Sequence, residues 1–424
     1  MKAWYRNFES RYLIILSILI MVGLAFVIDT PSNIGNGLIN IYTSPGLLVT
    51  DFLAVGGIGA TILNVAIILA FNFGLIHVLN IKYTGPVFAG IFTIAGFAFF
   101  GKTLLNTLPI YAGIYLYSLY SKVEFKNYII VALLSTGIGP IVSFIMFGMG
   151  LEYYYSIPLA IVTGLAVGFI LQIVATNAMK FHKGYNLYNI GFTLGLLAML
   201  FTGLFSRLSI PLNTQTMINN NYHNHLFLFA LVISIYCIVF AFANDINVLK
   251  KYPRLLKSTG RLVTDFVRET SQPEVMLNIG LLGILCLLFS VILQIPINGP
   301  IFGGIMTVMG FGAFGKHIKN VLPVMVGTLV AAWVFKLDIK TSVGVGLGFY
   351  FVTALAPVAG QYGIVAGLLA GFLHMIVLPM AMNFQGGFDL YNNGFAAGFV
   401  AAVLVPIFEI FQLKGEEDHV TTRN

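Results

Sequence analysis

Charged residues are scarce in this sequence, and their scarcity excludes an ordinary soluble protein. Asp, Glu, Lys and Arg make up 9% of the 424 residues, whereas about a quarter of a soluble domain is charged. Hydrophobic residues account for 58% of the chain, and the mean hydropathy is +0.93. Apolar stretches of roughly 20 residues recur along its length, so we expect an all-α integral membrane protein.

Catalytic and metal-binding patterns are also missing. The two cysteines, Cys237 and Cys286, lie inside apolar runs, which predicts small buried side chains and neither a disulfide nor a metal pair. The sequence has no H-E-x-x-H, C-x-x-C or nucleophile-elbow motif, and most acidic residues fall in loops or tails. We therefore expect no catalytic residue, no metal and no cofactor, and we predict that the protein is not an enzyme.

What the sequence does contain is a series of about 12–14 hydrophobic segments that can lie in a membrane. Lys and Arg are scattered over the short loops between them, so the net charge of +7 does not indicate a nucleic-acid partner. With the N-terminus inside, 18 Lys and Arg residues fall on the inner side and four on the outer side. This bias predicts a multi-pass protein of the lipid bilayer with both termini cytoplasmic. The segments are 12–28, 61–80, 85–101, 103–121, 127–148, 157–179, 184–206, 226–244, 275–295, 299–315, 318–335, 341–358, 362–381 and 388–412.

The sequence contains an internal repeat. Residues 85–113 read GPVFAGIFTIAGFAFFGKTLLNTLPIYAG, and residues 299–327 read GPIFGGIMTVMGFGAFGKHIKNVLPVMVG, displaced by 214 residues without a gap. Further on, GYNLYNIGFTLG at 184–195 matches GFDLYNNGFAAG at 387–398, displaced by 203 residues. A repeat of this length indicates a duplicated membrane unit.

We therefore predict two tandem homologous halves, 1–210 and 211–424. Seven segments separate equivalent points of the two halves, and this number is odd. An odd number of crossings predicts an inverted topology, as in many secondary transporters with a pseudo-twofold axis in the membrane plane.

One stretch of the first half resembles a phosphate-binding loop. GFAFFGKT at 96–103 fits the pattern G-x-x-x-x-G-K-[ST], but the second copy reads GFGAFGKH at 310–317. His317 replaces the hydroxyl that would bind magnesium, and the flanking segments are membrane helices rather than a strand and a soluble helix. We therefore do not expect a nucleotide site. The feature that both copies share is the Gly-Lys pair.

Lys102 and Lys316, the lysines of these pairs, are the principal candidates for binding a substrate. Almost no loop separates 85–101 from 103–121, so 85–121 and its counterpart 299–335 are either pairs of full spans or re-entrant or broken helices. In the second case both lysines lie within the membrane, where an ionisable residue usually marks a functional site. The alternative is that both lysines snorkel to the interface from the ends of ordinary helices.

Other polar residues are expected to complete such a site. Asn106 and Asn320 lie one helical turn after the lysines, where they could orient the lysines or a solute, or join two helices. Tyr188 and Tyr391 begin apolar runs, and an interfacial aromatic belt explains them, with a pore lining as the alternative. The remaining candidates for substrate binding are His317, Thr93, Thr307, Asn189 and Asn392.

Three acidic residues lie close to the apolar segments. Asp51 and Asp265 stand in the repeated LVTDF stretch and are expected to be solvated or capping acids. Asp389 matches Asn186 in the first half, so it has no acidic equivalent there.

The repeated motif G-P-x-F-x-G-I-x-T-x-x-G-F-x-x-F-G-K-x-x-x-N-x-L-P, together with L-Y-N-x-G-F, resembles a family of duplicated multispanning bacterial membrane proteins catalogued as a domain of unknown function. The resemblance covers nearly the whole chain, implies a location in the bacterial plasma membrane and implies no substrate. A looser architectural likeness is to urea channels, which are also built from inverted halves. The chain departs from that pattern by its two lysines, which a path for a neutral solute would not need.

Two classes of function are compatible with these features. The first is a transporter or channel for a small anionic solute, with a site between the inverted repeats. The second is a membrane scaffold or an intramembrane enzyme acting on lipid, which would use the basic loop 250–268. The sequence favours the first class, with a small-molecule solute as partner, and a homo-oligomer is compatible with it.

Overall fold

The computed structural model describes residues 2–212, 214 and 216–421, and their side chains from 15 to 411. The described residues are helical almost throughout. They contain no strand, and their only bridges are two isolated ones that join Thr50 to Met217 and Asp51 to Phe100. The prediction of an all-α protein is therefore confirmed.

The helices follow one another with short connections. The first half contains α1 (Lys2–Ile28), α2 (Pro31–Thr43), α3 (Phe52–Val55), α4 (Gly57–Val78), α5 (Gly85–Phe97), α6 (Leu104–Ser121), α7 (Ile129–Ser135), α8 (Gly139–Ser143), α9 (Tyr153–Phe181) and α10 (Asn189–Arg207). The second half contains α11 (His223–Asn244), α12 (Val248–Lys251), α13 (Phe266–Glu269), α14 (Gln272–Ile292), α15 (Gly299–Gly310), α16 (Ile318–Val334), α17 (Val343–Phe351), α18 (Ala356–Tyr362), α19 (Ile364–Gln385) and α20 (Asn392–Thr421). Short 3-10 turns are η1 (Phe125–Tyr128), η2 (Thr136–Ile138), η4 (Tyr252–Lys257), η5 (Phe311–Ala313) and η6 (Val352–Leu355), and η3 (Phe144–Gly148) is a π turn.

Within the described residues, nine helical stretches are long and apolar enough to cross a membrane, or up to ten if α1 and α2, bent by 112°, form one span. Every expected apolar segment coincides with a helix, but α2 was not expected. The short helix α5 has 13 residues, or about 20 Å, which is less than the roughly 30 Å of a hydrocarbon core. Its counterpart α15 has 12 residues. Neither is long enough for a full span, which favours the broken or re-entrant alternative.

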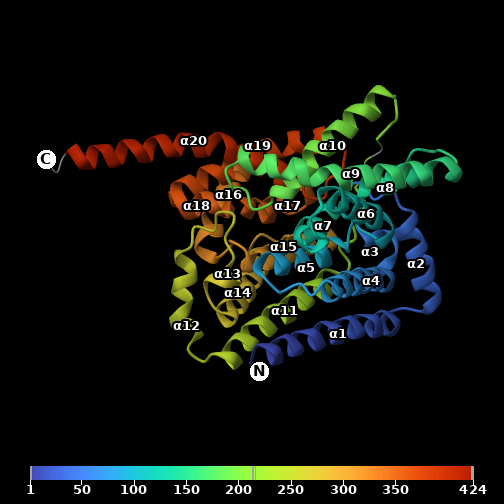
Figure 1. Ribbon diagram of the computed structural model, residues 1–424, viewed down its shortest axis with the longest axis horizontal. Coiled ribbons are helices and arrows are strands. Elements are labelled where there is room, and N and C mark those ends of the chain that lie inside the picture. Colours follow the sequence, from blue (N-terminus) through green and yellow to red (C-terminus); the bar gives the residue numbers. More distant parts are fainter. Residues whose placement is uncertain (1, 213, 215, 422–424) are drawn as a thin grey trace.

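The two short helices α5 and α15 lie side by side at the centre of the molecule (Figure 1). The helices α1, α4 and α11 lie on one side of this pair, and α10, α19 and α20 lie on the other side. Outer contacts are repeated: α1 packs on α4 as α11 packs on α14, and α6 packs on α9 as α16 packs on α19. The two halves therefore share one architecture, and they meet where α5 packs on α15 and α10 on α20. The boundary between residues 210 and 211 stays a prediction.

Glycines allow α5 and α15 to pack closely in antiparallel directions. Gly96, near the end of α5, lies against Gly303, near the start of α15, while Ala89 in the first part of α5 lies against Gly310 at the end of α15. A Cβ atom on Gly96 would stand 2.8 Å from the Gly303 Cα atom. Small residues at such contacts let two backbones approach, as in other membrane helix pairs.

Each half also caps the central helix of the other half. Asp51 Oδ2 accepts a hydrogen bond from the Gly299 N–H at the start of α15, at 3.3 Å. Asp265 Oδ1 accepts one from the Gly85 N–H at the start of α5, at 2.9 Å. The same carboxylates cap the short helices α3 and α13. The prediction of capping acids is confirmed, although both residues are buried rather than solvated.

The two capping carboxylates differ in their surroundings. Burial raises the pKa of Asp51 to about 6, because the loss of solvation outweighs the backbone N–H groups that donate to the carboxylate. Asp265 forms an ion pair with Arg268, with 3.1 Å between Oδ2 and Nε. With a pKa of about 6, Asp51 is mostly ionised at neutral pH. Its charge then interacts favourably with the positive ends of the helices that it caps.

Removing either crossed cap is expected to destabilise the protein. Asp51→Ala and Asp265→Ala should each lower the free energy of unfolding by about 1–2 kcal/mol, because they remove a capping acceptor and leave N–H groups unpaired. Thermal unfolding of the detergent-purified protein measures the loss. Glu124→Ala is the control, because the Glu124 side chain is 69% exposed. Equal unfolding temperatures for Asp51→Ala and Glu124→Ala would contradict crossed capping.

Two Gly→Ala substitutions are expected to have opposite effects. Gly96→Ala should lower the unfolding temperature, because the new methyl group would push α5 away from Gly303. Gly74→Ala, in α4, should raise it, because nothing lies within 4 Å of that Cβ position and Ala favours a helix by up to about 1 kcal/mol over Gly. The same thermal unfolding assay compares them, and a stabilising Gly96→Ala would contradict the close α5–α15 contact.

Candidate functional site

Both candidate lysines lie in breaks between helices. Lys102 lies in the break between α5 and α6, and Lys316 lies in the break between η5 and α16. The glycine before each lysine has a positive φ, +69° at Gly101 and +107° at Gly315. This backbone conformation favours glycine. The repeated Gly-Lys pair thus has a structural cause, because the glycine permits the turn from which the lysine enters the interior.

Asparagines on neighbouring helices hold these breaks. Asn64 Nδ2, on α4, donates to the Lys102 carbonyl at 3.0 Å and to the carbonyl four residues earlier at 2.8 Å. Asn278 Nδ2, on α14, makes the same two hydrogen bonds around Lys316, both at 2.7 Å. Carbonyl groups at a break lack helical partners, and in a membrane they must be satisfied within the protein. These two asparagines fix the backbone that carries the lysines.

Asn106 and Asn320 hold the other side of each break. Each forms a reciprocal capping box with the residue that precedes its helix, Thr103 for α6 and His317 for α16. Each also donates to the carbonyl of the glycine in its Gly-Lys pair, at 3.0 Å for Asn106 and 2.9 Å for Asn320. Asn106 additionally donates to Ser143 Oγ at 2.9 Å. Both asparagines therefore support the backbone and do not bond the lysine side chains.

Lys102 is fully buried, and its ammonium group faces an aromatic ring. The Nζ atom lies 5.4 Å from the centre of the Phe97 ring. No described residue accepts a hydrogen bond from it. A buried cation is costly unless it is paired and hydrogen-bonded. The Lys102 ammonium group therefore lacks the hydrogen-bond acceptor that a buried cation requires among the described residues.

Lys316 is equally buried, but its ammonium group is bonded. Its Nζ atom donates to Tyr188 Oη and to Thr353 Oγ1, the latter at 2.7 Å. It also lies 4.3 Å from the centre of the Tyr188 ring and 5.0 Å from that of Phe311, within the range of cation–π attraction. Neither Lys316 nor Lys102 reaches the protein surface, which contradicts the snorkelling alternative.

Aromatic rings from both halves connect the two lysines. The Phe97 ring centre lies 4.4 Å from that of Tyr391, which lies 6.1 Å from that of Tyr188. Both tyrosines are 2% exposed. The prediction of an interfacial belt is therefore wrong, because these residues precede α10 and α20 inside the protein. Tyr391 Oη, equivalent to the hydroxyl that binds Lys316, lies near the Thr93 side chain but has no partner with hydrogen-bond geometry among the described residues.

Three other predicted residues are used locally by the protein. The Thr93 and Thr307 hydroxyls each donate to the carbonyl four residues earlier in their own helix, at 2.7 Å. His317 caps α16, and its Nε2 atom lies 2.9 Å from the Ser258 carbonyl oxygen. Their side chains are occupied by these contacts. None of the three bonds a lysine ammonium group, since the threonines are bonded within their own helices and His317 supports the break before α16.

Asn189 and Asn392 occupy equivalent positions in different surroundings. Asn189 Oδ1 lies 2.9 Å from His182 Nε2. Asn392 Oδ1 accepts a hydrogen bond from Asn393 Nδ2 at 2.8 Å, and Asn392 lines a cavity of about 270 Å³. The predicted residues therefore do not form one cluster. The two lysines are linked through Phe97, Tyr391 and Tyr188, and Asn392 belongs to a separate cavity.

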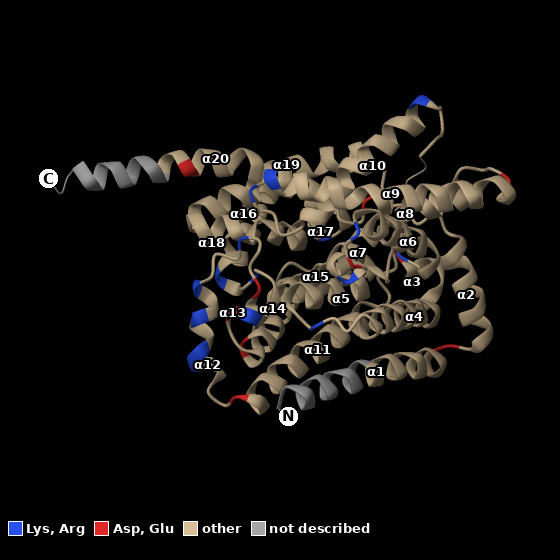
Figure 2. Ribbon diagram, in the orientation of Figure 1, with Lys and Arg blue, Asp and Glu red and all other residues tan. Residues whose placement is uncertain are grey.

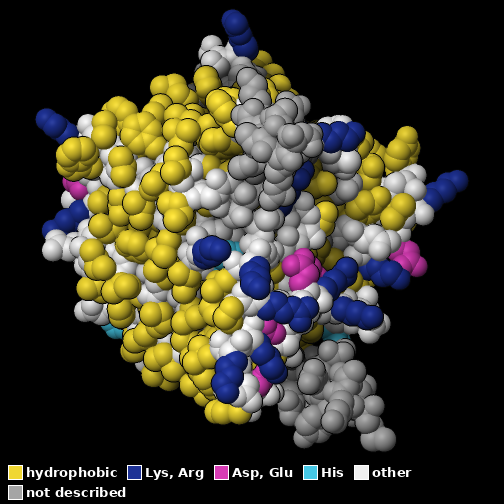
Figure 3. Space-filling model, turned by 90° about the vertical axis from the view of Figure 1, so that its left-hand side faces the viewer, with side chains coloured by type: hydrophobic (Ala, Val, Ile, Leu, Met, Phe, Trp, Pro, Cys, Tyr) yellow, Lys and Arg dark blue, Asp and Glu magenta, His cyan; other side chains and the backbone are white. Residues whose placement is uncertain are grey.

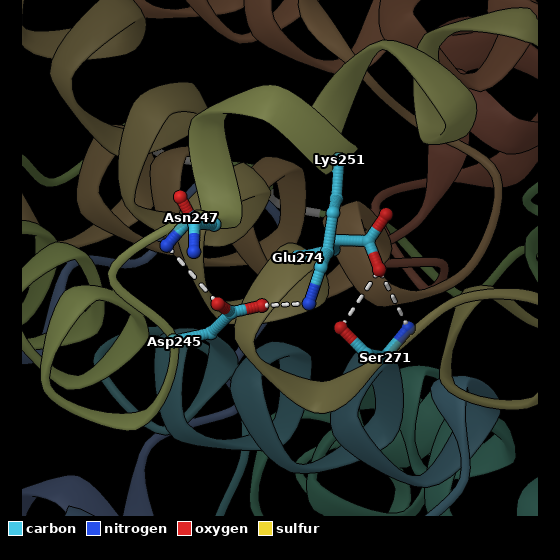
Figure 4. A network of polar contacts seen from close by, with 5 residues as sticks. All are labelled: Asp245, Asn247, Lys251, Ser271 and Glu274. Atoms are coloured by element: carbon cyan, nitrogen blue, oxygen red, sulfur yellow. Dashed lines mark hydrogen bonds and ion pairs between the residues drawn. The ribbon is translucent and has the colours of Figure 1, made fainter.

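The loop between α11 and α14 concentrates positive charge at one edge of the molecule. Figure 2 shows Lys and Arg along α12, while most of the helical body carries no charge, and Figure 3 shows basic side chains beside a broad hydrophobic area. Lys251 forms an ion pair with Asp245 at 2.5 Å, and this contact lowers the pKa of the Asp245 carboxyl. At the start of α14, the Glu274 carboxylate accepts hydrogen bonds from the backbone N–H and the hydroxyl of Ser271 (Figure 4). A pocket of about 350 Å³ in this region is lined by Lys250, Lys251, Pro253, Arg254, Lys257 and Glu274.

Replacing each of the two lysines by methionine is expected to have a different effect on stability, because their environments differ. Lys102→Met should leave the unfolding temperature unchanged or raise it, because it removes a buried cation without a hydrogen-bond partner. Lys316→Met should lower the free energy of unfolding by about 1–3 kcal/mol, and with it the unfolding temperature, because Tyr188 Oη loses its partner in the interior. Thermal unfolding of the two purified variants measures this difference. The reverse order of stability would contradict the hydrogen bonding described for the two lysines.

Comparison with known proteins identifies a family but no characterised relative. No curated protein and no solved structure matches the chain. The likeness to urea channels is therefore unsupported. The profile of the family described as "Protein of unknown function (DUF1576)" matches residues 30–207 and again residues 244–410. These two matches cover most of the chain and agree with the duplication seen in the repeated motifs, so the protein belongs to the DUF1576 family.

Proposed function

We propose that this multi-pass membrane protein is a transporter or channel for a small anionic solute, with its site between two inverted repeats. The observation that carries the proposal is the difference between the two buried lysines. Lys316 Nζ is bonded to Tyr188 and Thr353, whereas the equivalent groups Lys102 Nζ and Tyr391 Oη have no hydrogen-bond partner among the described residues. An anion could accept hydrogen bonds from both of these donors.

Charge supports an anionic rather than a neutral solute. An ionised lysine in a low-dielectric interior attracts a negative charge strongly, because little water screens it. Intramembrane cations of this kind usually lie on solute paths. The aromatic rings between the lysines belong to both halves, so a solute at this position would contact both halves.

The packing of the central helices supports the inverted arrangement. The pairs Gly96–Gly303 and Ala89–Gly310 require equivalent helices of the two halves to run in opposite directions. Short broken helices that meet at the interface of inverted repeats are a recurring feature of transporter sites. In this proposal both termini lie in the cytoplasm, the protein acts in the bacterial plasma membrane, either alone or as a homo-oligomer, and it is not an enzyme.

Anion binding to the purified protein tests the proposal. Small anions such as phosphate, sulfate, carboxylates and halides are expected to raise the unfolding temperature of the parent protein if they bind the folded state, by RT ln(1 + [L]/Kd) in free energy. Lys102→Met should abolish the shift caused by the transported anion. The same variant should abolish uptake of that anion into proteoliposomes.

The matched control for this test is Lys82→Met, which removes an exposed lysine. It should keep both the thermal shift and the uptake. If Lys102→Met and Lys82→Met respond to every anion alike, the proposed site is wrong. If no soluble anion stabilises the parent protein, transport of an anion loses its support.

The alternative function is a membrane scaffold or an intramembrane enzyme acting on lipid. The observation that favours it is the pocket of about 350 Å³ among Lys250, Lys251, Arg254 and Lys257, beside a hydrophobic surface (Figure 3). Basic clusters at this position attract anionic lipid headgroups. Stabilisation of the parent protein by phosphatidylglycerol, with no response to soluble anions, would favour this alternative.

A further inference from the structure

We infer that the cavity beside the start of α20 binds a small monovalent cation, at a site separate from the two lysines. The cavity has a volume of about 270 Å³. This is room for an inorganic ion with part of its hydration shell or for a small organic ammonium ion. It is lined by Leu48, Thr202, Leu212, Thr214, Met382, Asn383, Gln385, Gly386, Gly387, Asp389 and Asn392.

Two of the residues that line the cavity carry buried polar atoms without hydrogen-bond partners among the described residues. Gln385 is 1% exposed and Asp389 is fully buried. Neither Nε2 nor Oε1 of Gln385 has a hydrogen-bond partner among the described residues, and the same holds for Asp389 Oδ2. Buried polar groups are nearly always satisfied in folded proteins. Unpartnered polar atoms in residues that line a cavity point to a ligand that satisfies them.

The charges around the cavity select a cation. Among the described residues, Asp389 is the only ionisable one that lines it, and this lining contains no Lys, Arg or His. The remaining polar groups on the wall are amides and hydroxyls, from Gln385, Asn383, Asn392, Thr202 and Thr214. Carboxylate, amide and hydroxyl oxygens are hard ligands suited to alkali cations and ammonium groups. Near the mouth, Asn383 and Thr214 are exposed.

In the first half, internal hydrogen bonds use most of the polar atoms at the same positions, and only His182 Nδ1 among the described side-chain atoms there lacks a partner. His182, equivalent to Gln385, lies 2.9 Å from Asn189 Oδ1. Asn186, equivalent to Asp389, accepts a hydrogen bond from the Tyr188 N–H at 2.9 Å and donates to the Gly394 carbonyl at 2.8 Å. The second half keeps the bond from the Tyr391 N–H to Asp389 but lacks the other two contacts, because Gln385 and Asp389 replace the histidine and the asparagine.

Asp389 explains why the second half lacks a counterpart of the hydrogen bond that Asn186 donates to the Gly394 carbonyl. Its Oδ1 accepts a hydrogen bond from the Tyr391 N–H at 2.8 Å, as Asn186 does for Tyr188. Its Oδ2 stands in place of the Asn186 amide nitrogen, and an ionised carboxylate cannot donate to a carbonyl. Replacing the amide by a carboxyl group thus removes the amide donor and leaves Asp389 Oδ2 without a hydrogen-bond partner among the described residues.

Thermal unfolding of the full-length protein in detergent tests this inference. Sodium, potassium and ethylammonium chloride are titrated separately, with N-methyl-D-glucamine chloride keeping the ionic strength constant. At least one small cation should raise the unfolding temperature in a saturable manner, and the cation that does so distinguishes an inorganic ion from an organic ammonium ion. The same titration with gluconate salts should give the same shift, because the cation is responsible.

Asp389→Asn restores the residue that the first half carries at the equivalent position, so the fold is expected to tolerate it. It should weaken the apparent cation affinity by about tenfold or more, because a charge-assisted contact is lost. Asp338→Asn is the matched control, since Asp338 lies in an exposed loop, and it should keep the parent response. If Asp389→Asn does not fold, Gln385→His and radioactive sodium binding to the parent protein provide the comparison.

Two results would overturn the inference. One is a parent protein whose unfolding temperature responds to no small cation, together with no saturable sodium binding. The other is a cation response that Asp389→Asn and Gln385→His both retain. The assay measures cation binding alone. Its result is therefore independent of whether the two lysines take part in anion transport.

Discussion

The antiparallel contact between α5 and α15 constrains the rest of the structure. Both helices are too short to cross a bilayer, and they approach closely because Gly96 and Gly303 leave no side chain between them. Asp51 and Asp265 then fix their starting points by capping the helix of the opposite half. Neither central helix could keep its place without a residue of the other half, so the two halves form one structural unit.

The ends of these short helices create the chemistry of the interior. A helix that stops inside the protein leaves free carbonyl groups, and Asn64, Asn278, Asn106 and Asn320 satisfy those around the breaks. With the backbone satisfied, each break can bring a lysine into the interior. The buried lysines are thus a consequence of the broken helices, and their unequal hydrogen bonding distinguishes the two halves.

The two halves share a backbone plan but differ in the side chains that complete it. The Lys316 ammonium group has hydrogen-bond partners within the protein, whereas the Lys102 ammonium group has none among the described residues. At the starts of α10 and α20 the difference is reversed. Asn186 of the first half donates a hydrogen bond, whereas Asp389 Oδ2 of the second half has no partner among the described residues. Duplication supplies pairs of equivalent positions, and divergence at one member of a pair opens a polar site. A nearly symmetric protein with such differences offers two chemically distinct sites, one for the anion and one for the cation that we propose.

Much of the fold could be predicted from the sequence, because apolar length and the repeated motifs directly report helices and duplication. The breaks at Gly101 and Gly315 were also predictable, since glycine beside a lysine inside an apolar run has few other structural reasons. The positions of Tyr188 and Tyr391 were not, because tyrosine at the start of an apolar segment occurs equally at interfaces and in interiors. Asn64 and Asn278 carried a signal, as polar residues in apolar runs separated by the repeat displacement of 214.

The cavity at Asp389 could not be predicted, because it depends on which hydrogen bonds the neighbouring backbone offers. The sequence shows only that the acid has Asn186 as its equivalent. Whether that replacement is silent or opens a site depends on tertiary contacts made by the start of α20 with α10 and with the segment around Leu48.

We propose that Lys102 lies on a water-accessible path for an anion. Lys102→Cys, in a background with Cys237→Ala and Cys286→Ala, allows its accessibility to be measured with a charged, membrane-impermeant thiol reagent in oriented vesicles. We expect labelling from at least one side of the membrane, slowed by the anion that stabilises the parent protein. A cysteine at this position that reacts from neither side in the folded protein would contradict it.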